Sequence, residues 1–318
     1  CNFGGKMKIY IAPLAGVTDY TFRGILDDYK PDLMFTEMVS INALEMENEK
    51  TLNQILRIRD GEAVQIFGKD VEKMVYSAKY ITEKLGVKHI DVNAGCPVNK
   101  IIKNGYGAAL LENPDQIKRI LCEIREAIPE DVDLSLKTRV GYKGLKQHKL
   151  VGKIAEEAGC KHITIHGRTR EQMYSGTANW DLIKEVKESV NIEVIGNGDI
   201  FTAEDAYERV KHSGVDGIML ARGICGNPWL IQQIREKFET GDVITEVTPE
   251  MRLDMAIRHA LQGKLDNPNK KFLFELRKHL CWYLKGIRNG AALKGAINQI
   301  ESYDELIALL ERAKENLK

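Results

Sequence analysis

The sequence predicts an α/β protein: a (β/α)8 TIM barrel followed by a small C-terminal all-helical domain. Eight short β-rich segments recur within about 230 residues, and helix-like segments separate them. Several of the β-rich segments are continuous apolar runs, which is typical of strands buried on both faces. No strand pattern follows residue 248, and this indicates the helical domain. The predicted domains are residues 7–240 and residues 247–318.

Each strand of the barrel is predicted from a short run rich in apolar and β-branched residues. The predicted strands are Lys8–Ala12, Leu33–Glu37, Ala63–Phe67, His89–Asn93, Leu134–Thr138, His162–His166, Glu193–Gly196 and Gly217–Ala221. Between them, Val71–Leu85 and Asp115–Ala127 have helical spacing, and Asn113-Pro114 and Thr202 are helix-start signals. The alternative is an open doubly wound sheet, but no GxGxxG follows the first strand.

The composition changes at Glu239–Thr248, which we interpret as a linker. Four helices are predicted after it: Pro249–Leu265, Lys270–Lys285, Ala291–Ile300 and Tyr303–Leu317.

Bulk properties exclude several classes of protein. The 318 residues carry 46 basic and 46 acidic side chains, so net charge gives no argument for nucleic acid. Six scattered cysteines form no CxxC pair or zinc spacing, which favours reduced thiols and no metal. No run of about 18 apolar residues and no signal-peptide pattern occurs. We expect a cytoplasmic monomer, in which Cys1–Lys6 precede the first strand as a leader.

The exits of the predicted strands carry the candidate chemistry, because a barrel places its site on the loops that follow its strands. Polar or glycine-rich residues stand at nearly every exit, which packing alone does not explain. In chain order the exits are Pro13-Leu14-Ala15-Gly16, Glu37, Gln65, Asn93-Ala94-Gly95-Cys96-Pro97, Lys137-Thr138-Arg139, His166-Gly167-Arg168, Gly196-Asn197-Gly198-Asp199 and Ala221-Arg222-Gly223. We expect them to converge on one mouth.

The last two exits have the pattern of a phosphate site. Glycines there allow backbone N–H groups to approach an anion, and many barrels bind phosphate after strands seven and eight. Asn197–Asp199 and Ala221-Arg222 would form the cradle, with Arg222 as the charged partner; the alternative is a pair of tight β/α turns that need glycine.

Three further residues are candidate ligand contacts at strand ends. Lys137 either faces an anionic ring or extends its ammonium to solvent. His166 either contacts a ligand or lies satisfied in the core. Gln65 can offer both a donor and an acceptor to a ring edge.

Cys96 stands on a loop between a glycine and a proline, directly after a predicted strand. A buried inert cysteine is the usual role of this residue type, but this setting favours function. Cys122, Cys160, Cys225 and Cys281 lack such a setting and are interpreted as packing residues.

The chain resembles the tRNA-dihydrouridine synthases, most closely the bacterial DusB-like branch. The resemblance spans nearly the whole chain. It rests on APLAGVTD (Ala12–Asp19), FTEM (Phe35–Met38), QIFG (Gln65–Gly68), DVNAGCPV (Asp91–Val98), GYGAALL (Gly105–Leu111), LKTRVG (Leu136–Gly141), TIHGRTREQMYSG (Thr164–Gly176), NWD (Asn179–Asp181), GNGDI (Gly196–Ile200), ARGICGNPW (Ala221–Trp229) and RKHLCWYLKG (Arg277–Gly286).

The resemblance implies an FMN-dependent enzyme that reduces uridine in tRNA, with NAD(P)H as reductant. It implies that FMN is held by Pro13, Leu14, Ala15, Gln65, Lys137, His166, Asn197, Gly198, Asp199, Ala221 and Arg222. Leu14 departs from the methionine that relatives often carry, a change between apolar residues. Hydride would add to C6 of a flipped-out uracil, and Cys96 would protonate C5 from the opposite side.

The acid role requires a protonated thiol. A free cysteine has a pKa of about 8.5, and Lys137, Arg139 and His166 nearby would lower it. The reduced cofactor and the RNA phosphates would oppose that shift. We expect Asn93, Arg139 and Arg168 to contact the substrate.

The predicted helical domain is locally basic, because residues 247–300 hold ten basic and four acidic side chains. Such a surface fits salt-sensitive phosphate contact, although a solvated helix face is the alternative. The candidate tRNA contacts are Lys270, Lys271, Arg277, Lys278 and Lys285, whereas Trp282 and Tyr283 are expected in the core.

Three other functions share parts of this pattern. An FMN barrel acting on a free pyrimidine, like the dihydroorotate dehydrogenases, would not need a basic helical tail. An RNA-binding protein with an inactive barrel is opposed by intact Cys96 and Lys137. A phosphate-binding barrel lyase without flavin remains open on fold alone.

Overall fold

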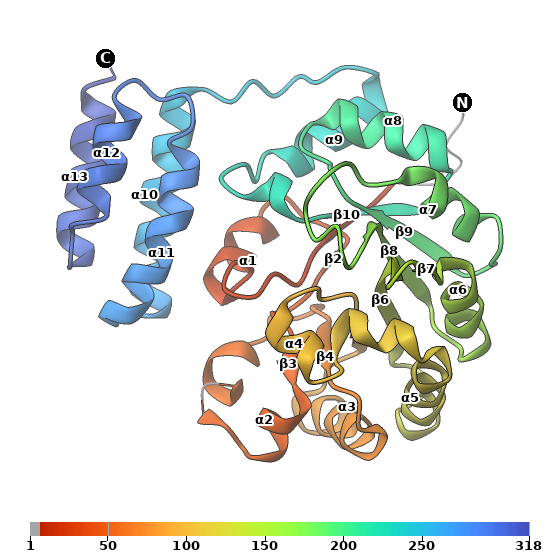
Figure 1. The fold of residues 1–318 in the computed structure, drawn as a ribbon. Helices are drawn as coiled ribbons and strands as arrows, with labels where there is room; N and C mark the ends of the chain where they lie inside the picture. Colours follow the sequence, from red (N-terminus) through yellow and green to blue (C-terminus); the bar gives the residue numbers. More distant parts are fainter. Residues whose placement is uncertain (1–6, 50, 318) are drawn as a thin grey trace. The chain divides into compact units, whose positions relative to one another are not determined.

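The computed structural model describes residues 7–49 and 51–317, so the predicted leader Cys1–Lys6 lies outside the described residues. The chain forms two compact units (Figure 1). The first comprises the described residues up to Tyr20, Pro31–Ile200 and Glu204–Ala221. The second comprises Thr21–Lys30, Phe201–Ala203 and the described residues from Arg222 onward. Compactness does not test which segments fold independently, so the predicted boundaries 7–240 and 247–318 stay a prediction.

The first unit is built on a curled, ten-stranded sheet (Figure 1) in the order β2-β1-β10-β9-β8-β6-β5-β4-β3, with β7 paired to β6. The strands are β1 (Lys8–Ile11), β2 (Leu33–Met34), β3 (Val39–Ser40), β4 (Val64–Phe67), β5 (His89–Ala94), β6 (Asp133–Tyr142), β7 (Leu145–Lys146), β8 (His162–Thr169), β9 (Glu193–Asn197) and β10 (Gly217–Leu220). Every pair along that order is parallel, and only β6 and β7 are antiparallel.

Residues 33–40 pair with the strands at both edges of the curled sheet. Met34 pairs with Ile11 of β1, and the next residue, Phe35, forms a parallel bridge with Ala63 beside β4. The Ala63 N–H donates to the Met34 carbonyl and the Thr36 N–H donates to the Ala63 carbonyl, each at 2.9 Å. These bonds join the edges, an arrangement consistent with a TIM-barrel-like fold. The predicted α/β class is confirmed.

Three predicted strands have clearly different bounds, and the one predicted over His162–His166 runs on to Thr169 as β8. Of the strand predicted over Leu33–Glu37 only β2 (Leu33–Met34) and the Phe35 bridge form, and β3 begins after it at Val39, because the chain passes from the edge of β1 to the edge of β4. The strand predicted over Leu134–Thr138 runs on to Tyr142 and turns back as β7. A Cβ on Gly141 would lie 2.2 Å from the Leu145 carbonyl oxygen, so this close pairing requires glycine.

Helices connect the strands of the first unit. They are α2 (Ile41–Glu45), α3 (Val71–Leu85), α4 (Asn99–Lys103), α5 (Pro114–Ala127), α6 (His148–Glu157), α7 (Trp180–Lys187) and α8 (Ala203–Ser213), with η1 (Thr51–Ile55) and η2 (Gly107–Glu112). The predicted starts at Asn113 and Thr202 are confirmed. Asn113 caps α5 by accepting from the Gln116 N–H, with proline in the first turn.

The second unit is helical. It holds most of α1 (Tyr20–Asp27), η3 (Arg222–Ile224), α9 (Leu230–Thr240), α10 (Pro249–Asp266), α11 (Lys270–Tyr283), α12 (Gly290–Ile297) and α13 (Tyr303–Glu315). Residues 241–248 of the predicted linker carry no helix or strand, whereas Glu239 and Thr240 belong to α9. Within this unit Phe22 stacks on His259 and contacts His279, with ring centroids 5.5 and 4.6 Å apart. Among the described residues, no helix is long and apolar enough to cross a membrane.

Candidate active site

The Cys96 loop follows β5 and is held by its own backbone. The N–H groups of Gly95 and Cys96 both donate to Asn93 Oδ1, at 3.1 and 3.0 Å. The Cys96 carbonyl accepts from the Ala108 N–H at 3.1 Å. A Cβ on Gly107 would lie 2.7 Å from that carbonyl oxygen, so η2 packs closely against the loop. The half-buried thiol therefore stands on a fixed segment.

The Cys96 thiol is stabilised in its protonated form. Burial raises its pKa above the usual range, and this effect outweighs a hydrogen bond from the Val98 backbone and the charges of Arg139 and Lys137. The sequence-based expectation that cations lower this pKa has the right sign, but the cations are the smaller effect. A protonated thiol in this place can act as a proton donor.

Gln65 and Asn93 are linked behind this loop. Asn93 Nδ2 donates to Gln65 Oε1 at 2.8 Å, and Gln65 Nε2 donates to Asp91 Oδ2 at 2.7 Å. Both ends of the Gln65 amide are thus engaged within the protein and the side chain is buried, so its predicted contact with a ligand ring stays a prediction. Asn93 is mostly buried, and its side chain holds the backbone of Cys96 through the hydrogen bonds given above.

Lys137 lies beside Asn93 in the register of β5 and β6. Its half-buried side chain has its pKa lowered to about 8, first by burial and then by Arg139, whereas Asp91 and Cys96 oppose the shift. Among the described residues none accepts a hydrogen bond from this ammonium. An ammonium with no such hydrogen-bond acceptor, close to the Cys96 thiol, can contact an anionic group.

Arg139 ties three segments together. Its Nε donates to the Gly95 carbonyl at 2.9 Å, and its Nη1 donates to the carbonyls of Thr169 and Met173 at 3.0 and 2.9 Å. The side chain is almost wholly buried. Its geometry fixes the Cys96 loop to the segment after β8, and its predicted contact with substrate stays a prediction.

Arg168 is buried in the same way. Its Nη1 and Nη2 make a two-point ion pair with Asp199, both at 2.8 Å, and its Nε donates to the Ser175 carbonyl at 3.0 Å. Asp199 also accepts from the Ala178 N–H at 2.7 Å. The predicted contact of Arg168 with the base is untested, but this geometry already engages its guanidinium in holding the loop at residues 169–178.

The exit of β9 is shaped by glycine. Gly198 has φ +130°, and a Cβ there would lie 2.6 Å from Ala178 Cβ and 3.0 Å from His166 Cδ2. The Trp180 indole N–H donates to the Gly198 carbonyl, and Asn197 Nδ2 donates to the Met219 carbonyl at 2.8 Å. Backbone groups can therefore approach a ligand here more closely than any side chain would allow.

The exit of β1 is a tight turn. The N–H groups of Val17 and Thr18 both donate to the Leu14 carbonyl, and the Leu14 N–H donates to Thr18 Oγ1 at 2.8 Å. Leu14 packs on the core cluster that contains Tyr10 and Met219, as does Ala221. Pro13 is half-buried and Ala15 is exposed. Arg222 belongs to the second unit, where its guanidinium lies over the Phe201 ring.

Comparison with known proteins identifies the family. The sequence model of the family described as Dihydrouridine synthase (Dus) matches residues 10–318. The chain belongs to the dihydrouridine synthase family. "tRNA-dihydrouridine synthase B" of Pasteurella multocida is 36% identical over 96% of this chain and 92% of that protein. "Probable tRNA-dihydrouridine synthase" of Rickettsia conorii is 38% identical over 93% of this chain and 90% of that protein.

These relatives confirm the predicted family, its DusB-like branch and the prediction of an oxidoreductase. Among solved structures, histamine dehydrogenase from Rhizobium sp. 4-9 aligns with a TM-score of 0.55. It is 13% identical and covers 80% of this chain and 49% of that protein, so it supports the fold alone.

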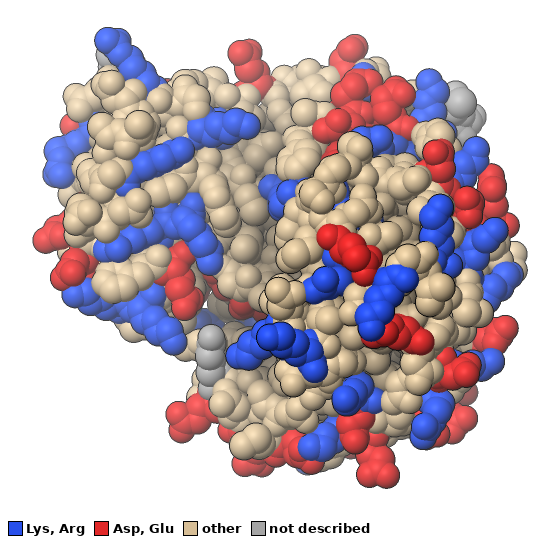
Figure 2. Space-filling view, in the orientation of Figure 1, with Lys and Arg blue, Asp and Glu red and all other residues tan. Residues whose placement is uncertain are grey.

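In this dihydrouridine synthase the predicted basic residues lie on α11 and just after it. Figure 2 shows Lys and Arg side chains spread over the visible face of the C-terminal helices. Several are paired: Lys270 with Glu301, Lys264 with Asp304 and Arg258 with Asp28. Residues 301–317 add five acidic and two basic side chains, so the net charge of residues 247–317 is +3 rather than the +6 of residues 247–300.

The predicted tRNA contacts differ in their availability. Lys271 and Lys285 are exposed and make no ion pair within the described part of the chain, so they are the most available for phosphate. Arg277 lies 4.2 Å from the Phe274 ring centroid and donates to the Ile300 carbonyl. Tyr283 is buried as expected, and Trp282 and Lys278 are half-buried.

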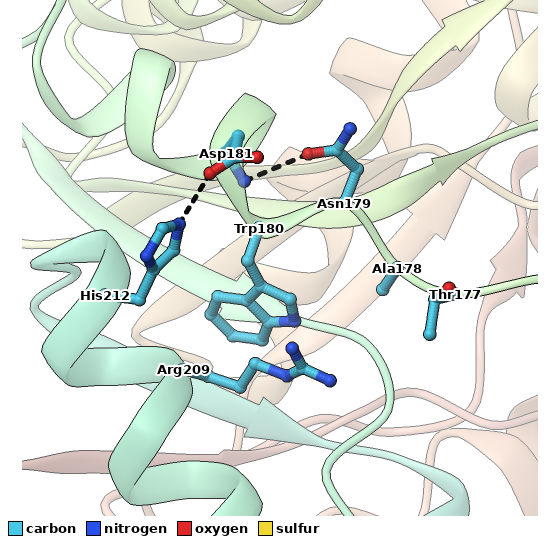
Figure 3. Close-up of a pocket in the computed structure, with 7 residues that line it drawn as sticks. All are labelled: Thr177, Ala178, Asn179, Trp180, Asp181, Arg209 and His212. Carbon is cyan, nitrogen blue, oxygen red and sulfur yellow. Dashed lines mark hydrogen bonds and ion pairs between the residues drawn. The ribbon is translucent and has the colours of Figure 1, made fainter.

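A pocket of about 480 Å³ lies on the first unit (Figure 3). It is lined by Thr177, Ala178, Asn179, Trp180, Asp181, Arg209 and His212. Asn179 caps α7 by accepting from the N–H groups of Asp181 and Leu182, and His212 Nε2 lies 2.6 Å from Asp181 Oδ1. No sequence-predicted site residue lines this pocket. Within the described residues, no cluster of three His, Cys, Asp or Glu could hold a metal.

Proposed function

We propose that this chain reduces specific uridines in tRNA to 5,6-dihydrouridine, with FMN as cofactor, NAD(P)H as reductant and Cys96 as general acid. The proposal includes a complete (β/α)8 barrel, a C-terminal helical domain that binds tRNA, and a cytoplasmic monomer. The observation that carries it is the Cys96 thiol, which burial keeps protonated on a loop fixed by Asn93 and Arg139.

The residues around Cys96 fit FMN. The Lys137 ammonium has no acceptor among the described residues, and its pKa of about 8 makes it responsive to a nearby anion. Gly198 leaves open a space that a side chain would fill. We assign FMN contacts to Pro13, Leu14, Ala15, Gln65, Lys137, His166, Asn197, Gly198, Asp199, Ala221 and Arg222. When bound, FMN supplies the hydride chemistry that protein side chains lack.

Asp199 would contribute its backbone rather than its carboxylate to this cofactor site. Both carboxylate oxygens already accept from Arg168, and Oδ2 also accepts from the Ala178 N–H. The carboxylate therefore orients the turn at residues 197–199, where Gly198 allows close backbone approach.

The chain's own residues hold and transfer the proton that uracil C5 receives. Cys96 Sγ holds it, because burial disfavours the thiolate, and donates it to C5 of the uracil. Lys137 and Arg139 carry positive charge close to the thiol, which stabilises the thiolate that remains after transfer. Asn93 keeps the Cys96 backbone in place during that transfer.

The tRNA would be recognised by phosphate contacts from the second unit. The available candidates are Lys271 and Lys285, with Lys270, Arg277 and Lys278 tied more closely to neighbours. Such contacts position the RNA without reading its sequence.

Comparing tRNA with free uridine as substrate tests this function. Purified protein loaded with FMN and NAD(P)H should form dihydrouridine in unmodified tRNA and should leave free uridine unchanged. Equal turnover of free uridine or another free pyrimidine would favour an enzyme like the dihydroorotate dehydrogenases. Protein that binds tRNA but no flavin would favour an inactive barrel with an RNA-binding role.

A further inference from the structure

A line of buried hydrogen bonds runs from the interior of the sheet to the Cys96 loop. Asp91 Oδ2 accepts from Gln65 Nε2 at 2.7 Å, and Gln65 Oε1 accepts from Asn93 Nδ2 at 2.8 Å. Asn93 Oδ1 in turn accepts from the Cys96 N–H at 3.0 Å. We call Asp91, Gln65 and Asn93 the polar ladder. Asp91 and Gln65 are 0% exposed, so water cannot replace a missing partner there.

The two ends of the polar ladder have fixed polarity. The backbone N–H of Cys96 can only donate, and an ionised carboxylate at Asp91 can only accept. The two amides between them could each turn over. A turned Gln65 would point its oxygen at the Asp91 carboxylate, and a turned Asn93 would point its NH2 group at the Cys96 N–H. Only the observed orientation satisfies every group.

Asp91 is itself held in place from its other side. Ser135 Oγ donates to Asp91 Oδ1 at 2.6 Å. That bond uses the one hydroxyl proton, so His89 Nε2, 2.8 Å from Ser135 Oγ, carries the proton of their hydrogen bond. Burial lowers the pKa of His89 to about 4, which keeps its ring neutral. Burial also raises the pKa of Asp91 to about 6, opposed by its bonds from Ser135 and Gln65, so the carboxylate is ionised at pH 8.

We propose that Asp91 is a positioning residue whose carboxylate sets the orientation of the Gln65 and Asn93 amides and thereby holds the loop that presents the Cys96 thiol. The positioning follows from the hydrogen bonds alone, and its effect on catalysis rests on the proposed function of Cys96. Displacement of a reacting group by about 1 Å costs about 100-fold in rate, so loss of this support would slow uridine reduction.

Exchanging the side chains of Asp91 and Asn93 tests directly whether the direction of these hydrogen bonds matters. Asn93→Asp places a carboxylate on each side of Gln65, and one of them must face the Gln65 oxygen. Asp91→Asn alone is tolerated, because its amide can turn its NH2 to Ser135 and the Ser135 hydroxyl can turn to His89. In the double variant Asp91→Asn/Asn93→Asp, the new amide donates to Gln65 Oε1, and Gln65 Nε2 donates to the new carboxylate. That carboxylate still accepts from the Cys96 N–H.

The primary readout is the rate at which iodoacetamide alkylates Cys96, measured by peptide mass spectrometry. The rate is recorded as a function of pH up to its plateau at high pH, where the thiol is fully ionised. Asn93→Asp should raise the plateau rate about tenfold, as expected for one lost buried hydrogen bond. It should also slow uridine reduction about 100-fold at pH 8. The double variant should restore the alkylation rate to within about threefold of wild type. Its uridine reduction should exceed that of Asn93→Asp but stay below wild type, because Asn93 is also a predicted substrate contact. Both variants carry the same carboxylate at position 93, beside the Cys96 backbone, and they differ only in the group at position 91.

Thr138→Val is the matched control. Thr138 Oγ1 makes another buried hydrogen bond to the same segment, to the Ala94 carbonyl at 3.1 Å, but lies outside the ladder. Adding Asp91→Asn should not improve Thr138→Val. If Asn93→Asp does not fold, recovery of a cooperative thermal transition in the double variant makes the same test.

Two results would overturn the proposal: a double variant no better than Asn93→Asp, or Asp91→Asn alone as impaired as Asn93→Asp. Failure of every variant and of wild type to reduce tRNA would instead count against the proposed function, while the alkylation rates still decide the positioning.

Discussion

The buried ion pair between Arg168 and Asp199 predicts that Arg168 acts mainly on stability. Their side chains are only 2% and 13% exposed, and the two bonds between them are both 2.8 Å long. Arg168→Met removes these bonds together with those to the Ser175 and Gly176 carbonyls. It leaves the Asp199 carboxylate with the Ala178 N–H as a partner. Breaking a buried pair from one side costs about 3–5 kcal/mol.

Urea denaturation of wild type and Arg168→Met measures this cost as a change in the free energy of unfolding. Lys118→Met is the control, because its ion pair with Glu157 is exposed and should be worth about 0–1 kcal/mol. Arg168→Lys keeps the charge but loses the two-point geometry. Its loss of unfolding free energy should therefore lie between those of Lys118→Met and Arg168→Met. Asp199→Leu combined with Arg168→Met should cost less than the sum of the single changes.

A different result is expected if Arg168 only contacts the flipped base, as the sequence predicted. A residue that only contacts substrate would slow the reaction with tRNA and leave the free energy of unfolding near that of wild type. If Arg168→Met costs no more stability than Lys118→Met, our account of the loop at residues 169–178 is wrong.

Three further predictions follow from other parts of the structure. Gly198→Ala should weaken FMN binding, measured by fluorescence titration, because its Cβ would meet Ala178 Cβ at 2.6 Å; unchanged affinity would remove Gly198 from the cofactor site. Lys271→Ala should reduce the slope of log affinity for tRNA against log salt by about 0.7–0.9, and an unchanged slope would mean that it contacts no phosphate. His162 is buried with its pKa well below the usual value, because burial disfavours the charged ring. Such a group stabilises less as the pH falls below its unfolded pKa, so His162→Phe should abolish about 2 kcal/mol of the stability lost between pH 7 and pH 5; an equal loss in both proteins would contradict this.

The sequence predicted the fold well because its signals were local. Buried parallel strands appear as apolar runs, and helix starts appear as caps such as Asn113 before Pro114. The turn from β6 to β7 was missed because Lys143-Gly144 is not a typical hairpin pair, although both residues have positive φ.

The sequence names candidate site residues but not the hydrogen bonds that connect them. Strand exits identify which side chains share one end of the sheet, yet they do not show what each side chain binds. Arg139 and Arg168 were expected to meet substrate because both are charged and follow strands. Their actual acceptors include backbone carbonyls of residues 169–176, and no sequence pattern marks a carbonyl as an acceptor.

The polar ladder was missed for a related reason. Asp91 stands within a predicted strand, where a buried carboxylate is costly unless it is paired. Its partners, Gln65 and Ser135, are distant in sequence and meet it only through the strand register. A charged residue inside an apolar strand was the available signal.

Single turnover with Cys96→Ala tests the central claim most directly. Enzyme carrying reduced flavin would be mixed with unmodified tRNA, and flavin oxidation and dihydrouridine would be followed together. Loss of a general acid should slow both by about 10²–10⁴-fold, while binding of FMN and tRNA stays close to wild type. If Cys96→Ala oxidises its flavin with tRNA as fast as wild type, Cys96 is not the proton donor.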